Sequence, residues 1–420
     1  MIEQKQIANN LYLCVADRRY KRDKLTIELA SDLSRATLTG KVLLPMVLSS
    51  ATRSCPDMVA ISRKLDMLYG ASLSANAAVY GSRVLLRFDI EGVSDAYLPD
   101  SCLGLEAAKM LLEVILQPAE QNGSFLPAVF AIERQKLAEL IRAQINNKRE
   151  YCMKLLRSAF YGDDVRGLPG SGFEEDLPAL TADVLWQIYR ELLQTSVAQV
   201  FYAGAHAEEM EQLLVSAFKG CLTRGEQIQE TPAKLPDSVI DITETVNIEQ
   251  DKLALLYHSG RMLSTDEIAA LRVANSIFGA SPTSRLFTNV REKQSLCYYC
   301  ASSRGMVSGG MLSIESGVSA KNALRAAEAM RNEFQQLAEA GPTVKELDET
   351  RLLLRNLLSG VSDSVGGYAS YTLSNIRSMG RPFSQSEELA MVEAVSAEDV
   401  KNILSSMQYC GSCRLTGEKA

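Results

Sequence analysis

The sequence is poor in histidine: its 420 residues include only His206 and His258. Imidazole is the side chain that proteins use most for general-base catalysis, for activating nucleophiles and for binding zinc. His206 starts a predicted helix, where a capping or exposed role is the simple interpretation, and His258 ends a predicted strand, where we expect a hydrogen-bonded histidine. Chemistry that depends on imidazole therefore has little to build on in this chain.

Other absences narrow the class of protein. The sequence contains no GxxxxGK[ST], GxGxxG or GxSxG motif, so phosphate-binding loops and serine-hydrolase sites are not expected. No apolar run approaches the ~18 residues that cross a bilayer, and the charged N-terminal segment lacks the apolar core of a secretory signal. The net charge of −7 argues against binding to nucleic acid or to anionic membranes. We expect a cytoplasmic protein without a membrane span.

The nine cysteines are an odd number in a long chain, which suits reduced thiols better than a disulfide framework. Two Cys-x-x-Cys pairs, Cys297 with Cys300 and Cys410 with Cys413, could in principle supply four thiolates to zinc. The first pair lies in a predicted strand, where residues three apart point to opposite faces. The second pair has a glycine turn but lacks the strand-to-helix setting of a redox motif. We therefore expect reduced structural cysteines.

Length and composition indicate two domains. The chain is 46% hydrophobic and 23% charged, as in ordinary globular proteins, and is about twice the usual single-domain size. Residues 222–244 are polar and contain two prolines, so we predict a domain at 1–222, a linker at 223–244 and a domain at 245–420. LLRFDIEGVS at 85–94 resembles GMLSIESGVS at 310–319, which suggests a duplication.

Helices and strands are intermixed without strict alternation, so each half is predicted to be α+β, with a mostly antiparallel sheet covered by helices. Apolar periodicity predicts the following elements. The helices are expected at 56–69, 107–116, 128–159, 181–193, 284–293, 322–340 and 344–358, and the strands at 25–30, 197–203, 253–258, 297–303 and 413–416.

Three stretches of the sequence resemble one protein family. TSRLFTNVREKQSLCYYCASS at 283–303 is similar to the C-terminal half-motif of the insulinase, pitrilysin and mitochondrial processing peptidase family. Residues 48–88 resemble the helix and hairpin that follow the family's zinc motif, and FYGDDVRGLPGSGFEEDLPAL at 160–180 resembles its YG…G…G stretch. The resemblance covers nearly the whole chain and implies the family's fold of two homologous α+β halves.

The zinc motif of that family is missing. Active members carry His-x-x-Glu-His, and the two histidine positions fall here on Val42 and Met46, with the glutamate position on Pro45. None of these side chains can bind zinc or act as a base. The family's third ligand falls on Leu140, or one residue away on Glu139, and a lone carboxylate makes no zinc site. We expect no metal in this chain, and a helix that is kinked at Pro45 or starts late.

A second pair of family residues is kept. Active relatives place an arginine and, seven residues later, a tyrosine across the cleft from zinc, and these correspond to Arg291 and Tyr298. The resemblance implies that Arg291 holds backbone carbonyls of the substrate and that the Tyr298 hydroxyl donates to the oxyanion. Alternatively, Arg291 caps its helix and Tyr298 packs between sheet and helices.

The family resemblance implies a role in a complex. Some bacterial members divide the work between two homologous chains, and this chain resembles the zinc-less, non-catalytic kind found in Firmicutes-type gene pairs. The expected partners are a homologous zinc-bearing subunit and a peptide substrate that adds a strand to a sheet edge. No peptidase activity is expected from the chain alone, and zinc is expected only in the partner. The alternatives are an inert scaffold or peptide-binding member, a peptidase with an unrecognised metal site, and a homodimer of the isolated chain.

Overall fold

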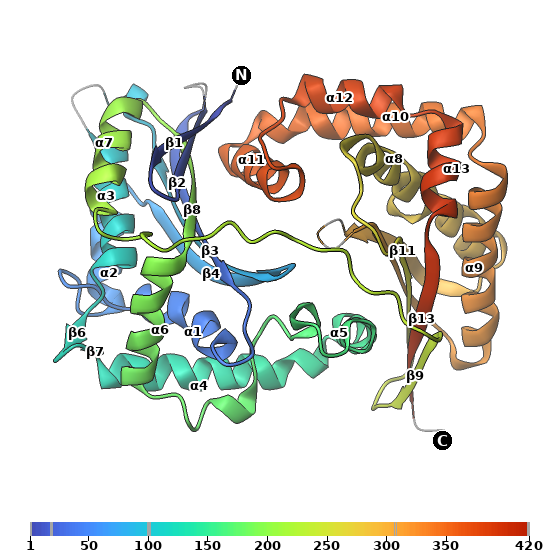
Figure 1. The fold of residues 1–420 in the computed structure, drawn as a ribbon, viewed down its shortest axis with the longest axis horizontal. Helices are drawn as coiled ribbons and strands as arrows, with labels where there is room; N and C mark the ends of the chain where they lie inside the picture. The colour runs from blue at the N-terminus through green and yellow to red at the C-terminus, as the bar shows by residue number, and fades with distance from the viewer. Residues whose placement is uncertain (1, 17–19, 99–101, 306, 308, 418–420) are drawn as a thin grey trace. The chain divides into compact units, whose positions relative to one another are not determined.

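The computed structural model describes residues 2–16, 20–98, 102–305, 307 and 309–417 (Figure 1). Its contacts divide the chain into two compact units that do not follow sequence order. The chain passes from one unit to the other after Arg142, Gly167, Gln229, Gly360 and Ser384. Unit 1 comprises Met1–Arg142, Leu168–Gln229 and Val361–Ser384, and unit 2 comprises Ala143–Gly167, Glu230–Gly360 and Gln385–Ala420.

Unit 1 is built on a six-stranded sheet in the order β1-β2-β8-β3-β5-β4. All neighbours in the sheet are antiparallel except β2 and β8, which are parallel. The strands are β1 (Gln4–Ala8), β2 (Leu11–Ala16), β3 (Arg22–Asp32), β4 (Ser72–Tyr80), β5 (Arg83–Val93) and β8 (Val197–Ala203). A separate two-stranded hairpin pairs β6 (Glu120–Gln121) with β7 (Ser124–Phe125).

Unit 2 repeats this arrangement in a five-stranded sheet ordered β11-β12-β10-β13-β9. If β1 is set aside, the strands of both sheets lie in the order first, fifth, second, fourth, third along the chain, and each sheet has one parallel pair, here β13 with β9. The resembling segments 85–94 and 310–319 become equivalent strands, β5 and β12. The predicted duplication and α+β class are confirmed. The strands are β9 (Ile240–Thr245), β10 (Asp251–His258), β11 (Cys297–Gly305), β12 (Met311–Val318) and β13 (Gln408–Thr416).

Helices cover both faces of each sheet. None of the helices within the described ranges is long and apolar enough to cross a membrane. In unit 1 they are α1 (Leu38–Leu48), α2 (Met58–Met67), α3 (Leu103–Leu116), α4 (Pro127–Ala143), α6 (Ala182–Thr195), α7 (Ala207–Ala217) and α11 (Val365–Met379). In unit 2 they are α5 (Lys148–Tyr161), α8 (Thr265–Asn275), α9 (Ala323–Ala340), α10 (Val344–Gly360), α12 (Gln385–Ala394), α13 (Ala397–Ser405) and the π-helices η5 (Ser276–Ala280) and η6 (Leu286–Lys293). Short 3-10 turns complete the chain at η1 (Asp95–Tyr97), η2 (Gln144–Asn146), η3 (Val165–Gly167), η4 (Glu174–Asp176), η7 (Ala320–Asn322) and η8 (Val361–Asp363).

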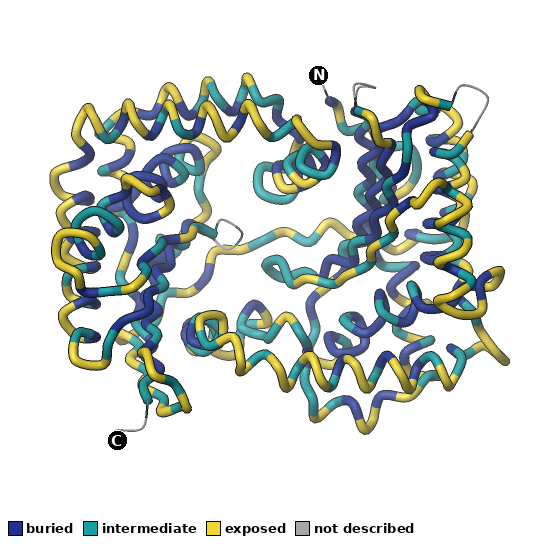
Figure 2. The backbone as a smooth tube through the Cα atoms, turned by 180° about the vertical axis from the view of Figure 1, so that it is seen from behind, coloured by how far each residue is buried: buried dark blue, intermediate teal, exposed yellow. Residues whose placement is uncertain are grey.

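The second face of the unit 1 sheet is covered by α11, a helix from the C-terminal half of the chain. Its residues Val365, Ala369, Leu373 and Ile376 form one buried cluster with Phe201 and neighbouring side chains of β2 and β8. These helix positions are three or four residues apart, as one helix face requires. Figure 2 shows the central strands as continuously buried, whereas the helices alternate between buried and exposed turns. Because β8 is covered on both sides, its VAQVFYA sequence is apolar almost throughout.

Unit 2 receives the reciprocal helix. Helix α5, from the N-terminal half, places Cys152, Leu156 and Phe160 against β10 and β13 in a buried cluster with Leu256 and Leu415. The predicted helix 128–159 is therefore two helices, α4 and α5, separated by η2. Asn147 marks the second start, because its side chain accepts a hydrogen bond from the Glu150 N–H at 3.4 Å.

These exchanged segments cut across the predicted domain boundaries at 222 and 245. Residues 143–167 pack in unit 2 and residues 361–384 pack in unit 1, because each covers an apolar sheet face that its own half leaves open. The predicted linker also ends differently. Residues 225–236 have no regular structure, but Ile240–Thr245 form β9. Every second residue of β9 is exposed and polar, so in the sequence this strand resembles a polar connector.

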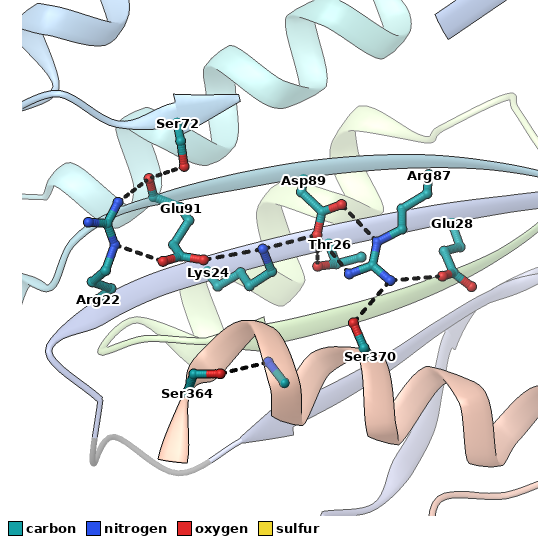
Figure 3. A network of polar contacts seen from close by, with 11 residues as sticks. Arg22, Lys24, Thr26, Glu28, Ser72, Arg87, Asp89, Glu91, Ser364 and Ser370 are labelled. Carbon is teal, nitrogen blue, oxygen red and sulfur yellow. Dashed lines mark hydrogen bonds and ion pairs between the residues drawn. The ribbon is translucent and has the colours of Figure 1, made fainter. Parts of the chain in front are cut away.

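A strip of charges lies beside the apolar contact of α11, as Figure 3 shows. Alternate residues of β3 and β5 face each other in register, with Lys24 opposite Glu91, Thr26 opposite Asp89, and Glu28 opposite Arg87. Burial alone would raise the pKa of Asp89, but hydrogen bonds from Arg87 and Thr26 and the charge of Lys24 hold it below its ordinary value. Opposite charges that are directly paired across strands stabilise the sheet.

Arg377 of α11 joins this strip. Its Nη1 donates to both carboxylate oxygens of Glu28, at 2.8 and 2.6 Å, and the Glu28 side chain is only 4% exposed. The Arg87 guanidinium lies 3.6 Å from the same carboxylate and 3.4 Å from the Ser370 hydroxyl of α11. A buried carboxylate thus holds the exchanged helix to the sheet.

We predict that Leu373→Ala, on α11, will speed amide exchange in β8, about 170 residues earlier in the chain. The Leu373 side chain is 1% exposed, and such truncations typically cost about 2–5 kcal/mol. Leu156→Ala on α5 should act on β10 and β13 instead. Hydrogen-exchange mass spectrometry reads both effects. Leu352→Ala on α10 is the control, because that side chain is 58% exposed. An effect confined to each variant's own half would contradict the exchange of helices.

We predict that Glu28→Gln will lower the free energy of unfolding by about 3–5 kcal/mol, because Arg377 would lose its buried counter-charge. Glu191→Gln is the matched control. Glu191 pairs with Arg224 at 2.7 Å, both side chains are 59% exposed, and exposed pairs contribute less than about 1 kcal/mol. Urea unfolding of the two variants measures the difference. Equal effects would show that the buried contact does not hold α11.

Candidate functional site

The residues that the sequence comparison aligns with the family's zinc ligands lie on α1 and α4 of unit 1. Val42 and Met46 are half-buried and pack against the unit 1 core, and Pro45 is buried. Leu140 on α4 is 57% exposed, and the neighbouring Glu139 accepts a hydrogen bond from Gln135 at 3.1 Å. Within the described residues, no group of three His, Cys, Asp or Glu side chains could hold a metal ion. These positions offer apolar contacts and no set of metal donors.

Helix α1 runs from Leu38 to Leu48 and contains Pro45 as its eighth residue. Of the two expectations raised by Pro45, a late start of the helix is therefore wrong, and a kink at Pro45 stays a prediction. Its ends are held by neighbouring backbone, with the Lys41 N–H bonded to the Thr37 carbonyl and the Ser49 N–H bonded to the Pro45 carbonyl. Burial of nine of its eleven residues stabilises a helix that proline alone would disfavour.

One buried carboxylate near this helix was not predicted from the sequence. Glu133 on α4 is 5% exposed and accepts hydrogen bonds from the Ser50 hydroxyl at 2.9 Å and from Lys136 Nζ at 2.7 Å. It lies on the buried face of α4 with Phe130 and Leu137. Its spacing from these apolar residues was the signal in the sequence that indicated its burial. Through the hydrogen bond from Ser50 it links the end of α1 to α4.

Arg291 lies near the end of the π-helix η6 in unit 2. Its guanidinium sits over the Phe287 ring at 4.6 Å, and its side chain is 39% exposed. The nearest carboxylate oxygen is that of Glu292, 3.7 Å from its Nε. Wide helical turns of this kind are frequent at functional sites. Stacking on Phe287 fixes the plane of the guanidinium while leaving part of it in solvent.

Tyr298 follows Arg291 after a tight turn. In this turn the Leu296 N–H bonds to the Val290 carbonyl at 3.2 Å, and Ser295 adopts a left-handed backbone conformation with φ 51°. Cys297 pairs with Val318 and Tyr299 pairs with Gly317, so Tyr298 is the extra residue of a β-bulge. Its side chain is 55% exposed. The alternative that Tyr298 packs between sheet and helices is therefore wrong.

The bulge also corrects the expectation for the first cysteine pair. Cys297 pairs with Val318 and Cys300 pairs with Ser316, and these two partners lie on the same face of β12. Cys297 and Cys300 therefore share a face, whereas an unbroken strand would separate them. The pair Cys410 and Cys413 lies in β13, where a register shift also occurs, and both side chains are fully buried. All nine cysteines are free thiols.

The contacts of the two histidines indicate structural roles. His206 precedes α7 and places its Nε2 3.2 Å from the Asp95 carboxylate, with its side chain 26% exposed. His258 is fully buried at the end of β10, where its Nδ1 accepts the Gly260 N–H at 2.9 Å. Burial lowers the pKa of His258 to about 4, so this imidazole is neutral at physiological pH. Arg291 and Tyr298 thus remain the candidates for a functional role.

Comparison with protein families gives a match to the domain described as "Peptidase M16 inactive domain" over residues 179–354. A Bacillus subtilis protein described as "Probable inactive metalloprotease YmfF" is 26% identical over 388 residues, which cover 92% of this chain and 91% of that protein. "Uncharacterized zinc protease YmxG" of the same organism is 26% identical over 251 residues, or 59% of this chain and 60% of that protein.

Solved structures have the same fold. A conserved protein from Enterococcus faecalis V583 aligns with a TM-score of 0.88 and 25% identity, covering 100% of this chain and 99% of that one. A peptidase M16 inactive domain from Pseudomonas fluorescens aligns with a TM-score of 0.80 and 17% identity, covering 100% and 98%. The inactive-domain match and the near full-length similarity to a protein described as a probable inactive metalloprotease show that this chain resembles inactive members of the peptidase M16 family.

Proposed function

We propose that this chain is the non-catalytic subunit of a two-chain zinc metallopeptidase. In this proposal a homologous partner holds the zinc, and this chain supplies Arg291 and Tyr298 to the partner's active site. The observation that carries the proposal is the exposed Tyr298, the extra residue of a bulge seven residues after Arg291, in a chain whose residues at the aligned zinc-ligand positions are apolar.

The exposure of Tyr298 favours a role outside the core. A tyrosine that serves stability buries its ring and hydrogen-bonds its hydroxyl, as Tyr189 does here: it is 3% exposed and donates to the Ile115 carbonyl at 2.9 Å. Tyr298 instead stands on a bulge, a device that redirects a side chain and often lies beside active sites. Its hydroxyl is suited to donate a hydrogen bond to the oxyanion of a tetrahedral intermediate.

Arg291 suits the binding of a peptide backbone. Its guanidinium carries five N–H donors in a planar fork, and the stacking on Phe287 orients that fork. Charge-assisted hydrogen bonds from it to substrate carbonyls would position the peptide for attack. When bound in the partner, zinc would supply the activated water.

We predict that the chain, tagged and purified from its own source, will bring down an equimolar homologous chain that carries His-x-x-Glu-His. Zinc should be present in the complex at about one ion per pair and absent from this chain purified alone. Mass spectrometry and metal analysis measure both. Recovery of this chain alone, or of a large assembly without that motif, would favour the inert scaffold or peptide-binding alternative.

We predict that Tyr298→Phe will lower peptide turnover by the complex about 10²–10³-fold, as the loss of one oxyanion donor does elsewhere. The two chains should still copurify, because only a hydroxyl is removed. Tyr299→Phe is the matched control. Tyr299 lies next in the strand, but its ring contacts Arg149 and Lys252 beneath the sheet. Equal turnover by the Tyr298→Phe complex and the unsubstituted complex would refute a catalytic role for that hydroxyl.

A further inference from the structure

The bulge that exposes Tyr298 also aligns the thiols on either side of it. Cys297 and Cys300 lie opposite Val318 and Ser316, which are two residues apart on one face of β12. Two residues of strand span about 6.6 Å. A Cα separation of that size falls within the roughly 4.4–6.8 Å range that disulfides span. An unbulged strand would place residues three apart at about 10 Å, with their side chains on opposite faces.

The two thiols have different surroundings. Cys300 is 6% exposed and belongs to the unit 2 core, whereas Cys297 is half-buried at the edge of that core. A hydrogen bond from the Cys300 thiol lowers the pKa of Cys297, an effect that burial opposes and that Ser316 and the charge of Arg291 assist. Cys297 is thus the accessible thiol with thiolate character, and Cys300 lies behind it.

The other cysteines lack this combination. Cys14 and Cys410 are buried, and burial raises the pKa of each thiol to about 12. Cys152 is buried beside Cys413, and their hydrogen bond, together with burial, raises the pKa of Cys152. Cys102 is exposed and is not in a Cys-x-x-Cys pair. Accessibility, thiolate character and a neighbouring second thiol therefore coincide at Cys297.

We propose that Cys297 and Cys300 are a redox modification site, at which a hydroperoxide converts the two thiols into a disulfide across the bulge. The Cys297 thiolate attacks the peroxide O–O bond, which gives a sulfenic acid on Cys297 and, with hydrogen peroxide, releases hydroxide that takes up a proton to form water. The Cys300 thiol then attacks that sulfur, forming the S–S bond and releasing a second water. The pair loses two electrons, and the peroxide gains them.

The consequence for the complex rests on the proposed function. The disulfide would close a covalent ring that contains Tyr298. It would also restrain the bulge, because the two bonded sulfurs lie on the face of the strand that packs on the core. Oxidation would also remove the Cys297 thiolate that the Arg291 charge stabilises. Both residues proposed to act in the partner's active site would thus have altered surroundings, so we expect the oxidised subunit to support slower turnover.

The test treats the full, reduced chain with hydrogen peroxide, blocks remaining thiols with an alkylating agent and maps peptides by mass spectrometry. We expect a cross-link between Cys297 and Cys300, a mass loss of two hydrogen atoms and full reversal by a dithiol reductant. Cys300→Ala should stop the reaction at the Cys297 sulfenic acid, which dimedone traps, and Cys297→Ser should leave Cys300 reduced. Thermal unfolding confirms that each variant is folded.

The second Cys-x-x-Cys pair is the internal control, because Cys410 and Cys413 share the spacing but are fully buried. Failure of the folded chain to form the Cys297–Cys300 cross-link, or equally fast oxidation of Cys410 and Cys413, would overturn the proposal. In the complex, oxidation should lower turnover reversibly in the unsubstituted chain and not in Cys297→Ser. If Tyr298→Phe leaves turnover unchanged, the proposed function fails while the cross-linking result stands by itself.

Discussion

The second face of each sheet carries an apolar cluster, and in each unit a helix from the other half of the chain covers this cluster. Helix α11 supplies Leu373 to the face that carries Phe201, and α5 supplies Leu156 to the face that carries Leu256. Burial of this apolar surface contributes favourably to the folding of each unit. The charged strip on β3 and β5 also fixes the position of α11 on the sheet, because Glu28 accepts hydrogen bonds from Arg377 at a single position of that helix.

The candidate site is also held in place by a sheet, through the strand β11. Helix η6 and the turn after it fix the start of β11, and β12 fixes the register that leaves Tyr298 as the extra residue. One bulge therefore has two results: it presents a phenol to solvent and brings two thiols to the same side of the sheet. On α1, by contrast, Val42 and Met46 pack against the apolar core of unit 1.

Much of this was predictable from local pattern. Alternation and apolar runs predicted β8 at its observed bounds, and sequence motifs predicted the resemblance to the peptidase M16 family. The roles of the α1 positions and of Arg291 and Tyr298 stay predictions. The exchange of helices was not predictable in this way, because the spacing of Cys152, Leu156 and Phe160 defines an apolar face but not the sheet that it covers. The bulge was not predicted because it is defined by the register of β11 against β12, which the residues of β11 alone do not specify. Glu133 was missed because a charged residue on an apolar helix face is usually taken as exposed.

The exchange of helices also has a consequence for synthesis on the ribosome. The sheet of unit 1 has all its strands once Ala203 is made, but the segment that covers its second face ends only at Ser384. At usual rates of about 5–20 residues per second, the nascent sheet waits roughly 10–40 s with an apolar surface uncovered. Helix α5, by contrast, is synthesised long before the strands of unit 2 that it covers. The N-terminal half of this chain therefore cannot finish folding first, and during that interval it is a natural client for chaperones that bind exposed apolar strands.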